Sequence, residues 1–361
     1  MVKKDLVIIG GGPAGLSAAK VALEAGMKVT IIERASILGG QLVKQTHKFF
    51  GSKEQYAKTR GIDIATILIE DLNAYSNNLE ILKNATVVGM YKDYVLTIYQ
   101  ENRYFKYQAK AIIVATGASE KVLAFENNDL PGIYGAGAVQ TLMNLYGVLP
   151  GQEVVMVGSG NIGLIVSYQL IQAGVKVKAL LEAADHIGGY LVHAAKLIRL
   201  GVPILTKTTV KKAFGKDKLE KIETIKLDNH WNYIEGTETV INCDALCISV
   251  GLTPLHQLMS MAEIDMKYVN ELGGLIPVKN CDYETSMPYV FACGDVTGIE
   301  EASSAMVEGK IAGLKASNSL GFIHPEHNKL NKEFYDQLSV LRQGPCGSKI
   351  RSGLRKVGET V

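Results

Sequence analysis

Two glycine-rich segments of this chain carry the residue types that hold a dinucleotide, and the first lies at its start. Gly10, Gly12 and Gly15 directly follow an apolar run, and the acid Glu33 stands 23 residues after Gly10. In such a turn the first glycine permits a tight bend, the second lets a pyrophosphate approach the main chain, and the third lets a helix pack closely on a strand. An acid at this distance accepts hydrogen bonds from a ribose. The segment therefore predicts a nucleotide site.

The second segment repeats this pattern about 150 residues later. Gly158, Gly160 and Gly163 follow another apolar run, and Glu182 stands 24 residues after Gly158. Two such turns predict two bound dinucleotides, whose usual purpose is electron transfer between them. Glu182 would repel a 2′-phosphate and residues 182–186 contain no arginine, so NADH is favoured over NADPH. A duplicated domain can also keep its fold and bind another nucleotide such as ATP, or none.

Both turns lie in strand–helix–strand units. The stretch 5–9 reads as a buried strand, 15–25 as an alanine-rich helix ended by Gly26, and 29–32 as a second strand. The stretch 153–182 reads the same way, and each unit is expected to be right-handed.

The duplication continues past the two acids, because Gly39-Gly40 follows Glu33 as Gly188-Gly189 follows Glu182. We therefore expect an α/β fold with two Rossmann-like dinucleotide-binding domains, the second inserted into a discontinuous first one. The expected parts are an FAD-type domain at 1–120 and 285–322, an NAD-type domain at 121–284, and a basic C-terminal tail at 323–361.

Composition excludes several other classes of protein. The net charge of +2 gives no electrostatic case for a nucleic-acid partner. No apolar run reaches the ~20 residues of a transmembrane span, and the apolar start runs directly into the first glycine turn rather than into a cleavage site. These features predict a cytoplasmic protein without a transmembrane segment.

The five cysteines form no metal or redox pattern. None forms a Cys-x-x-Cys pair, and the odd, scattered set argues for a reducing compartment. Cys243 and Cys247 stand four apart in a stretch that reads as one strand, and we expect them to be buried structural thiols. No metal site is predicted.

Further segments give the chain a family resemblance. These are residues 39–42, 86–87, 115–117 (Ala-Thr-Gly) and 291–295 (Phe-Ala-Cys-Gly-Asp). Together with the two turns, they resemble the two-dinucleotide flavoprotein disulfide reductase superfamily, in its short, thioredoxin-reductase-like form, over roughly residues 1–320. The resemblance implies that the first turn binds FAD and the second a nicotinamide cofactor, with hydride transfer between nicotinamide C4 and flavin N5.

The resemblance also implies the binding residues. Asp295 would hold the ribityl chain, and the helix that starts near Ala302 would point its positive end at the flavin and stabilise its reduced form. The FAD-binding residues implied are Gly10, Gly12, Pro13, Ala14, Gly15, Glu33, Arg34, Gly40, Gln41, Leu42, Thr86, Val87, Ala115, Thr116, Gly117, Gly294, Asp295, Ala302 and Ser303. The NAD-binding residues implied are Gly158, Gly160, Asn161, Ile162, Gly163, Glu182 and Gly251.

The chain lacks the redox cysteines of this superfamily. Thioredoxin reductases carry a Cys-x-x-Cys where this chain has residues 132–140, which contain no cysteine. Larger disulfide reductases and NADH peroxidases carry cysteine shortly after the first Gly-Gly, and residues 41–52 contain none either. Disulfide reduction and sulfenate peroxidase chemistry are therefore not expected.

Residues 135–142 and 146–151 resemble a narrower group, the flavoprotein subunits of opine oxidase, hydrogen cyanide synthase, dye-linked proline dehydrogenase and sarcosine oxidase complexes. This resemblance implies an FAD-dependent, NAD(H)-linked electron-transfer subunit of an amine or amino-acid dehydrogenase. Its partners would be a second flavoprotein, an iron–sulfur protein, or both. The alternatives are a stand-alone NAD(P)H reductase for ferredoxin, a quinone or a dye, and a nucleotide-holding structural subunit. Homo- or hetero-oligomers are both open.

Two weaker candidates remain. His47 and Lys48 follow the Gly-Gly segment, with Lys44 and Gln45 nearby, and would donate a proton or stabilise charge on the flavin, or be ordinary loop residues. The tail around Cys346 would dock a partner or be a solvated terminus.

Overall fold

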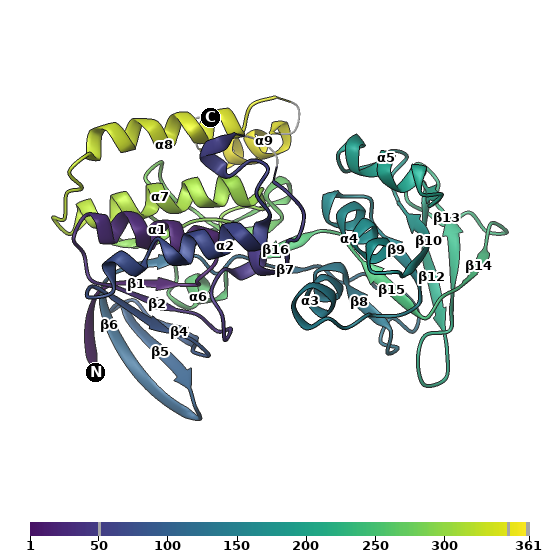
Figure 1. Cartoon of the computed structure of the whole chain (residues 1–361), viewed down its shortest axis with the longest axis horizontal. Helices are drawn as coiled ribbons and strands as arrows, with labels where there is room; N and C mark the ends of the chain where they lie inside the picture. Colours follow the sequence, from purple (N-terminus) through teal and green to yellow (C-terminus); the bar gives the residue numbers. More distant parts are fainter. Residues whose placement is uncertain (50–51, 345–346, 359–361) are drawn as a thin grey trace. The chain divides into compact units, whose positions relative to one another are not determined.

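A computed structural model describes residues 1–49, 52–344 and 347–358 (Figure 1). The chain divides into two compact units, Met1–Ser119 with Thr253–Val361, and Glu120–Leu252. It passes between them in β7 (Ala118–Glu120) and β16 (Leu252–Pro254).

The first unit is built on a seven-stranded sheet with the order β3-β2-β1-β6-β5-β4, in which β19 also pairs with β6. β1, β2, β3, β6 and β19 run parallel, whereas β4, β5 and β6 form an antiparallel meander. The strand bounds are β1 Val2–Ile9, β2 Val29–Ile32, β3 Leu79–Leu82, β4 Thr86–Met90, β5 Val95–Gln100, β6 Arg103–Val114 and β19 Val290–Ala292.

Helices α1 (Pro13–Glu24) and α7 (Ala302–Ser319) cover one face of this sheet and pack unusually closely. A Cβ added to Gly309 would lie 2.1 Å from the Ala14 carbonyl oxygen, and one added to Gly313 would lie 2.4 Å from the Ala18 carbonyl oxygen. Only glycine permits this approach. This close approach places α1, which follows the first glycine turn, directly against α7, which follows residues 291–295. α2 (Gly61–Glu70) and the 3₁₀ helices η1 (Gly40–Lys44), η2 (Lys53–Gln55) and η3 (Asn73–Tyr75) complete this side.

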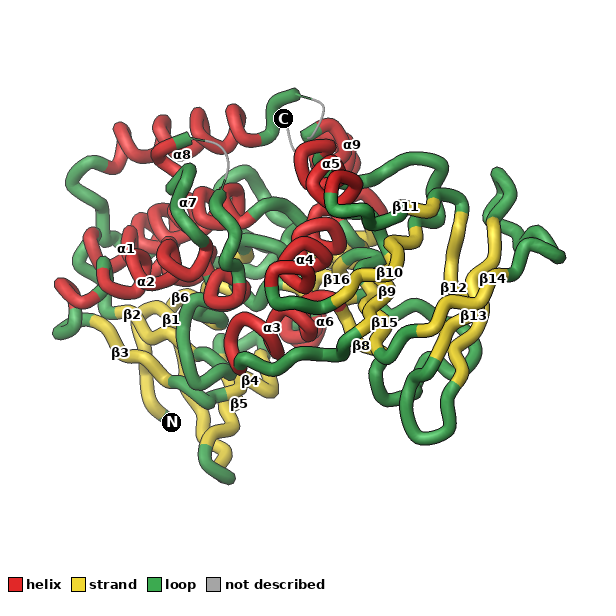
Figure 2. The backbone as a smooth tube through the Cα atoms, turned by 45° about the vertical axis from the view of Figure 1, so that its right-hand side comes forward, coloured by secondary structure: helices red, strands yellow, loops and turns green. Residues whose placement is uncertain are grey.

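The C-terminal residues are not a loose tail. Residues 327–341 form α8 and residues 348–356 form α9. α8 lies on α7, on the side away from the sheet, as Figures 1 and 2 show. Phe334 and Leu338 of α8 are buried in the same apolar cluster as α1 and α7. Cys346 lies outside the described residues.

The second unit repeats the parallel α/β design. Its five-stranded sheet has the order β11-β10-β9-β15-β8, and a second sheet has the order β12-β13-β14. The helices are α3 Ala136–Tyr146, α4 Asn161–Gln172 and α5 Leu191–Arg199. The strands are β8 Ile133–Gly135, β9 Glu153–Val157, β10 Lys176–Leu181, β11 Ile204–Leu205, β12 Thr208–Phe214, β13 Lys221–Lys226, β14 Thr239–Asn242 and β15 Ala245–Ile248.

The units divide at a different point from the expected second domain boundary of 284/285. Residues 253–284 lie in the first unit and form α6 (Gln257–Met261), β17 (Met266–Val269), η4 (Asn270–Leu272) and β18 (Gly274–Pro277). Met259 and Ile264 are buried against the face of the first sheet opposite to α1. This packing explains the difference.

The expected single strand through Cys243 and Cys247 is wrong, although both thiols are buried as predicted. β14 ends at Asn242 and β15 begins at Ala245, and the two strands belong to different sheets. Asp244 interrupts the stretch, because its carboxylate accepts hydrogen bonds from the N–H groups of Gln152 and Glu153. The two thiols consequently lie in different apolar clusters.

Candidate dinucleotide sites

Two positions of the first glycine turn, Gly10 and Gly15, have no room for a side chain. A Cβ on Gly10, whose φ is +110°, would lie 2.3 Å from the Ala115 carbonyl oxygen. A Cβ on Gly15 would lie 1.9 Å from the Gly10 carbonyl oxygen. These contacts press β1, α1 and the end of β6 together.

Gly12 has a different role, because space rather than backbone lies beside it. A Cβ there would meet only the Gly40 Cα, at 3.8 Å. Gly12 is also the N-cap of α1, and no described side chain caps that helix end. Backbone N–H groups and the positive end of α1 therefore face an open space that suits a pyrophosphate.

Glu33 is fixed beside this turn by the backbone. One carboxylate oxygen accepts the Gly11 N–H at 2.7 Å and the other accepts the Ala35 N–H at 2.8 Å. The residue is buried, with 8% exposed. Each carboxylate oxygen has a second lone pair, so the carboxylate remains able to accept ribose hydroxyls.

The remaining FAD candidates come from distant parts of the sequence, and several converge here. The Gly39 N–H donates to the Gly11 carbonyl, which brings Gly40 to the turn. A Cβ on Gly294 would lie 2.9 Å from the Ala14 Cβ, so residues 291–295 contact the start of α1. Thr86 and Val87 begin β4 directly after Ala85, whose N–H donates to the Glu33 carbonyl.

The other FAD candidates lie on the same elements. Pro13 opens α1, and Arg34 is exposed just after β2. In η1, Leu42 is buried and Gln41 is exposed. In the first turn of α7, Ser303 is buried and Ala302 is half-buried. The Thr116 hydroxyl donates to the Leu255 carbonyl at 2.9 Å, and Gly117 follows it with a φ of +71°.

Asp295 has an unusual carboxyl group. Burial raises its pKa to about 7. The hydrogen bond from the Glu300 N–H opposes this rise, and the nearby charges of Glu308, Glu300 and Glu301 add to it. The Glu300 N–H donates to one carboxyl oxygen at 3.3 Å, and the other oxygen makes no hydrogen bond within the described part of the chain. That oxygen is available to a ligand hydroxyl.

The second turn reproduces the first contact for contact. A Cβ on Gly158 would lie 2.1 Å from the Ser249 carbonyl oxygen, and one on Gly163 would lie 2.1 Å from the Gly158 carbonyl oxygen. Beside Gly160 there is open space, and no described side chain caps α4, which begins at Asn161 and continues through Ile162. Gly251, with a φ of +113°, lies just past β15.

Glu182 is held as Glu33 is, with one addition. Its carboxylate accepts the N–H groups of Ser159 and Ala184, both at 2.8 Å, and also the Ser159 hydroxyl at 2.5 Å. Sequence reasoning missed Lys207, whose N–H donates to the Ala184 carbonyl and whose ammonium group bonds Asn229 at 2.8 Å. Lys207 lies in the β11–β12 turn next to Ala184 and Asp185, and no local motif marks this neighbourhood.

His47 and Lys48 lie in the loop between η1 and α2. The His47 ring stacks on Phe49 with centroids 5.9 Å apart, and Lys48 forms an isolated backbone bridge with Arg60. Lys48 is exposed, and Lys44 and Gln45 are half-buried. Their role at a flavin stays a prediction.

A carboxylate from outside residues 132–140, the segment that contains no cysteine, contacts the start of α3. Glu120 accepts the N–H groups of Gly137 and Ala138 at 2.6 and 3.2 Å, and so caps the start of α3. A Cβ on Gly135 would lie 2.2 Å from a Glu120 carboxylate oxygen. A negative charge therefore lies at the positive end of α3.

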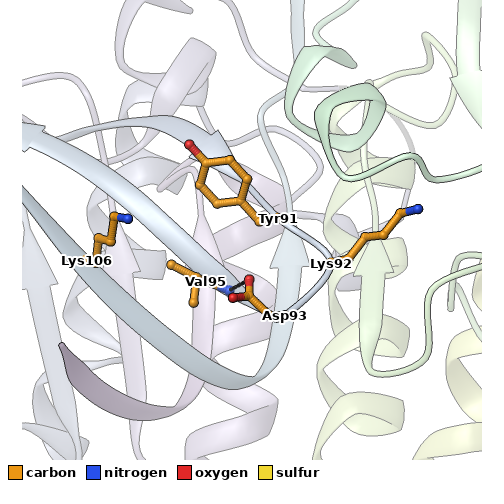
Figure 3. Close-up of a pocket in the computed structure, with 5 residues that line it drawn as sticks. All are labelled: Tyr91, Lys92, Asp93, Val95 and Lys106. Carbon is orange, nitrogen blue, oxygen red and sulfur yellow. Dashed lines mark hydrogen bonds between the residues drawn. The ribbon is translucent and has the colours of Figure 1, made fainter.

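A shallow hollow of about 540 Å³ lies elsewhere, on the β4–β5 hairpin (Figure 3). Its lining residues are Tyr91, Lys92, Asp93, Val95 and Lys106, and Lys92 extends away from the other four. None of these residues belongs to either glycine turn. Among the described residues, no group of three or more His, Cys, Asp or Glu side chains is arranged to hold a metal ion.

The sequence model of one family matches residues 4–309, which contain both turns and residues 291–295. The chain belongs to the pyridine nucleotide-disulphide oxidoreductase family. It is an FAD-dependent oxidoreductase of that family, with two Rossmann-like domains, as the sequence predicted. The matched region ends before α8.

Curated relatives belong to oxidase and synthase complexes. They include the alpha subunit of sarcosine oxidase from Corynebacterium sp. (strain P-1), 25% identical over 89% of this chain and 33% of the relative. The hydrogen cyanide synthase subunit HcnB from Pseudomonas protegens is 26% identical over 93% and 75%. An opine oxidase subunit from Agrobacterium tumefaciens is 24% identical over 88% and 66%. The chain thus spans between a third and three quarters of these relatives, and the predicted resemblance is confirmed.

Solved structures share the fold. Thioredoxin reductase from T. acidophilum has a TM-score of 0.73 at 23% identity, covering 89% of this chain and all of that one. L-proline dehydrogenase from P. horikoshii has a TM-score of 0.69 at 22% identity, covering 93% and 59%.

The family implies FAD and a pyridine nucleotide, and the two turns fit both groups. The open space beside Gly12 and Gly160, the uncapped starts of α1 and α4 and the preset carboxylates of Glu33 and Glu182 match a pyrophosphate and a ribose. No described helix is both long and apolar enough to cross a membrane.

Proposed function

We propose that this chain is an FAD-dependent, NAD(H)-linked electron-transfer subunit of a multi-subunit amine or amino-acid dehydrogenase. The observation that carries the proposal is the contact-for-contact repetition of one dinucleotide turn in both units, in a chain with no cysteine in residues 41–52 or 132–140. Two dinucleotides without a thiol relay favour electron transfer to a partner protein.

Each turn has a defined task in this proposal. When bound, FAD and NAD(H) supply the hydride chemistry. The start of α1 binds the pyrophosphate of FAD while Glu33 orients its ribose, and the start of α4 and Glu182 do the same for NAD(H). Asp295 accepts a ribityl hydroxyl with its free oxygen. The protein therefore contributes binding and orientation.

The choice of partners rests on the relatives. Sarcosine oxidase, opine oxidase and hydrogen cyanide synthase are represented by subunits, and this chain spans only part of each. A second flavoprotein that oxidises the amine, an iron–sulfur protein, or both would complete the complex.

One observation favours a second function, a stand-alone NAD(P)H reductase. The chain covers the whole of a thioredoxin reductase that has the same fold. An acceptor such as ferredoxin, a quinone or a dye would then replace the partner subunits. A nucleotide-holding structural subunit is the third possibility.

Anaerobic stopped-flow absorbance separates these functions. The purified yellow protein is mixed with NADH and, in parallel, with NADPH, while tagged protein is isolated from its native source to identify co-purifying chains. Rapid bleaching of the flavin band by NADH together with stoichiometric partner chains supports the proposal. Bleaching without partners supports the stand-alone reductase. No bleaching by either nucleotide or by a partner's amine substrate supports the structural subunit.

A further inference from the structure

Arg342 brings a charge from the C-terminal segment into the interior of the first unit. It follows α8, outside the region that the family model matches, and its side chain is only 8% exposed. Its Nε lies 3.1 Å from both carboxylate oxygens of Glu300, and its Nη2 lies 2.6 Å from Glu300 Oε1 and 2.5 Å from Glu308 Oε1. One guanidinium thus joins two buried carboxylates.

Glu308 connects this arginine to the segment that carries Asp295. Its Oε2 accepts the Gly294 N–H at 2.7 Å and the Thr297 hydroxyl at 3.3 Å. Its Oε1 also accepts the Tyr283 hydroxyl at 3.0 Å. The carboxylate therefore holds residues on both sides of Asp295, through the Gly294 backbone and the Thr297 side chain.

Glu300 reaches Asp295 directly, because its N–H donates to an Asp295 carboxyl oxygen. Burial raises the pKa of Glu300, and the charge of Arg342 opposes that rise. Three carboxyl groups thus share a small buried region at the start of α7. Without a paired cation, such a region is strongly destabilised.

The segment that carries Arg342 is itself anchored. Arg351 of α9 donates to the Arg342 carbonyl and, at 3.1 Å, to the Gly344 carbonyl. Leu354 of α9 is buried against Leu272 of η4, whose carbonyl accepts the Ile299 N–H at 3.1 Å. Residues 294–300 are therefore held from the α8 side and the α9 side.

We propose that α8, Arg342 and α9 form a built-in support for the flavin end of the FAD site, with Arg342 as its positioning residue. The inference rests on the proposed FAD site. By pairing with both Glu300 and Glu308, Arg342 keeps the Asp295 segment and the first turn of α7 in their binding conformation.

The test is an FAD titration of the full-length apoprotein, followed by quenching of flavin fluorescence. Arg342→Met keeps an unbranched side chain and removes the charge, and we expect FAD affinity to fall about tenfold or more. Arg342→Lys keeps the charge, and we expect its FAD affinity to lie between those of the wild type and Arg342→Met. Arg355→Met, an exposed arginine on α9, is the matched control and is expected to bind as the wild type does.

A charge-rescue variant distinguishes positioning by charge from loss of packing. Arg342→Met with Glu300→Gln removes both the cation and one carboxylate charge and leaves the hydrogen bonds of Glu308 to Gly294 and Tyr283 in place, so we expect it to regain most of the lost affinity. No recovery, or unchanged FAD affinity in Arg342→Met, would overturn the inference. If Arg342→Met and Arg342→Lys lost pyridine-nucleotide binding as much as FAD binding, the inference would also be overturned, because the effect would then be global. Wild-type apoprotein that binds no FAD would refute the proposed function instead.

Discussion

The hydroxyl of Ser159 donates to the carboxylate of Glu182 at 2.5 Å and accepts the Gly188 N–H at 2.9 Å. The first turn has Gly11 at the matching position, which offers only its N–H to Glu33. A side chain there is impossible without repacking, because a Cβ would lie 2.4 Å from a Leu38 methyl carbon. The two turns share their backbone contacts but hold their acids differently, so each acid can be tested separately.

Glu182→Gln is expected to reduce the preference for NADH over NADPH about tenfold. The substitution removes the charge that repels a 2′-phosphate and leaves Lys207 as the nearby cation. The measurement is the ratio of kcat/KM for flavin reduction by the two nucleotides. Glu220→Gln, at an exposed position of the same unit, is the control. An unchanged ratio would contradict the role given to Glu182.

Gly12→Ala and Gly160→Ala are expected to weaken binding of different dinucleotides. Both residues have negative φ angles that alanine adopts, and a Cβ would extend into open space rather than into the protein. Gly12→Ala should lower FAD affinity about tenfold, whereas Gly160→Ala should raise the KM for NADH and leave FAD bound. Flavin content after purification and steady-state kinetics check the two effects.

Gly15→Ala is the contrasting control for this pair. Its Cβ would lie 1.9 Å from the Gly10 carbonyl oxygen, so we expect loss of folded protein rather than of ligand affinity alone. Thermal unfolding followed by circular dichroism measures this loss of folded protein. A folded Gly15→Ala protein, or an unfolded Gly12→Ala protein, would contradict this division of roles.

Short-range patterns predicted the turns because their function depends on local geometry. The spacing from Gly10 to Glu33 sets one strand–helix–strand unit, and that unit fixes where the acid lies. The convergence of residues 86–87, 115–117 and 291–295 on this turn came from a family resemblance, since no local rule pairs β19 with β6.

The features that the sequence did not predict depend on contacts between distant segments. Arg342 reads as one more cation of a basic tail, and only the packing of α8 on α7 places it between Glu300 and Glu308. Glu120 lies 17 residues from Gly137, so nothing local shows that it caps α3. The strand break at Asp244 likewise depends on the backbone at Gln152 and Glu153.

Electron transfer is expected to continue when Cys281 and Cys346 are replaced. Among the described cysteines, Cys281 is exposed, and Cys243, Cys247 and Cys293 are buried. Burial raises the pKa of Cys243 to about 12 and raises those of Cys247 and Cys293 further, so none of these three is a reactive thiolate at neutral pH.

The test combines Cys281→Ala with Cys346→Ala and measures NADH-dependent reduction of a dye. We expect activity within about twofold of the wild type, because no thiol relays electrons. Treatment of the native wild type with iodoacetamide is the companion measurement and should also leave activity unchanged. Loss of activity in either experiment would restore a thiol mechanism.

The stability of the apoprotein is expected to fall as the pH rises from 5 to 8, in part because of Asp295. Its pKa of about 7 in the folded chain exceeds the ordinary carboxyl value of 3.8, so between these values the folded state binds more protons than the unfolded state. Stability from this group is therefore greatest at the acid end and is lost as the pH approaches 7. Asp295→Asn removes the titration, so its Tm should decline less over the same range. Asp217→Asn, at an exposed position, should decline as the wild type does. Equal slopes in all three proteins would show that Asp295 titrates as an ordinary surface carboxyl group.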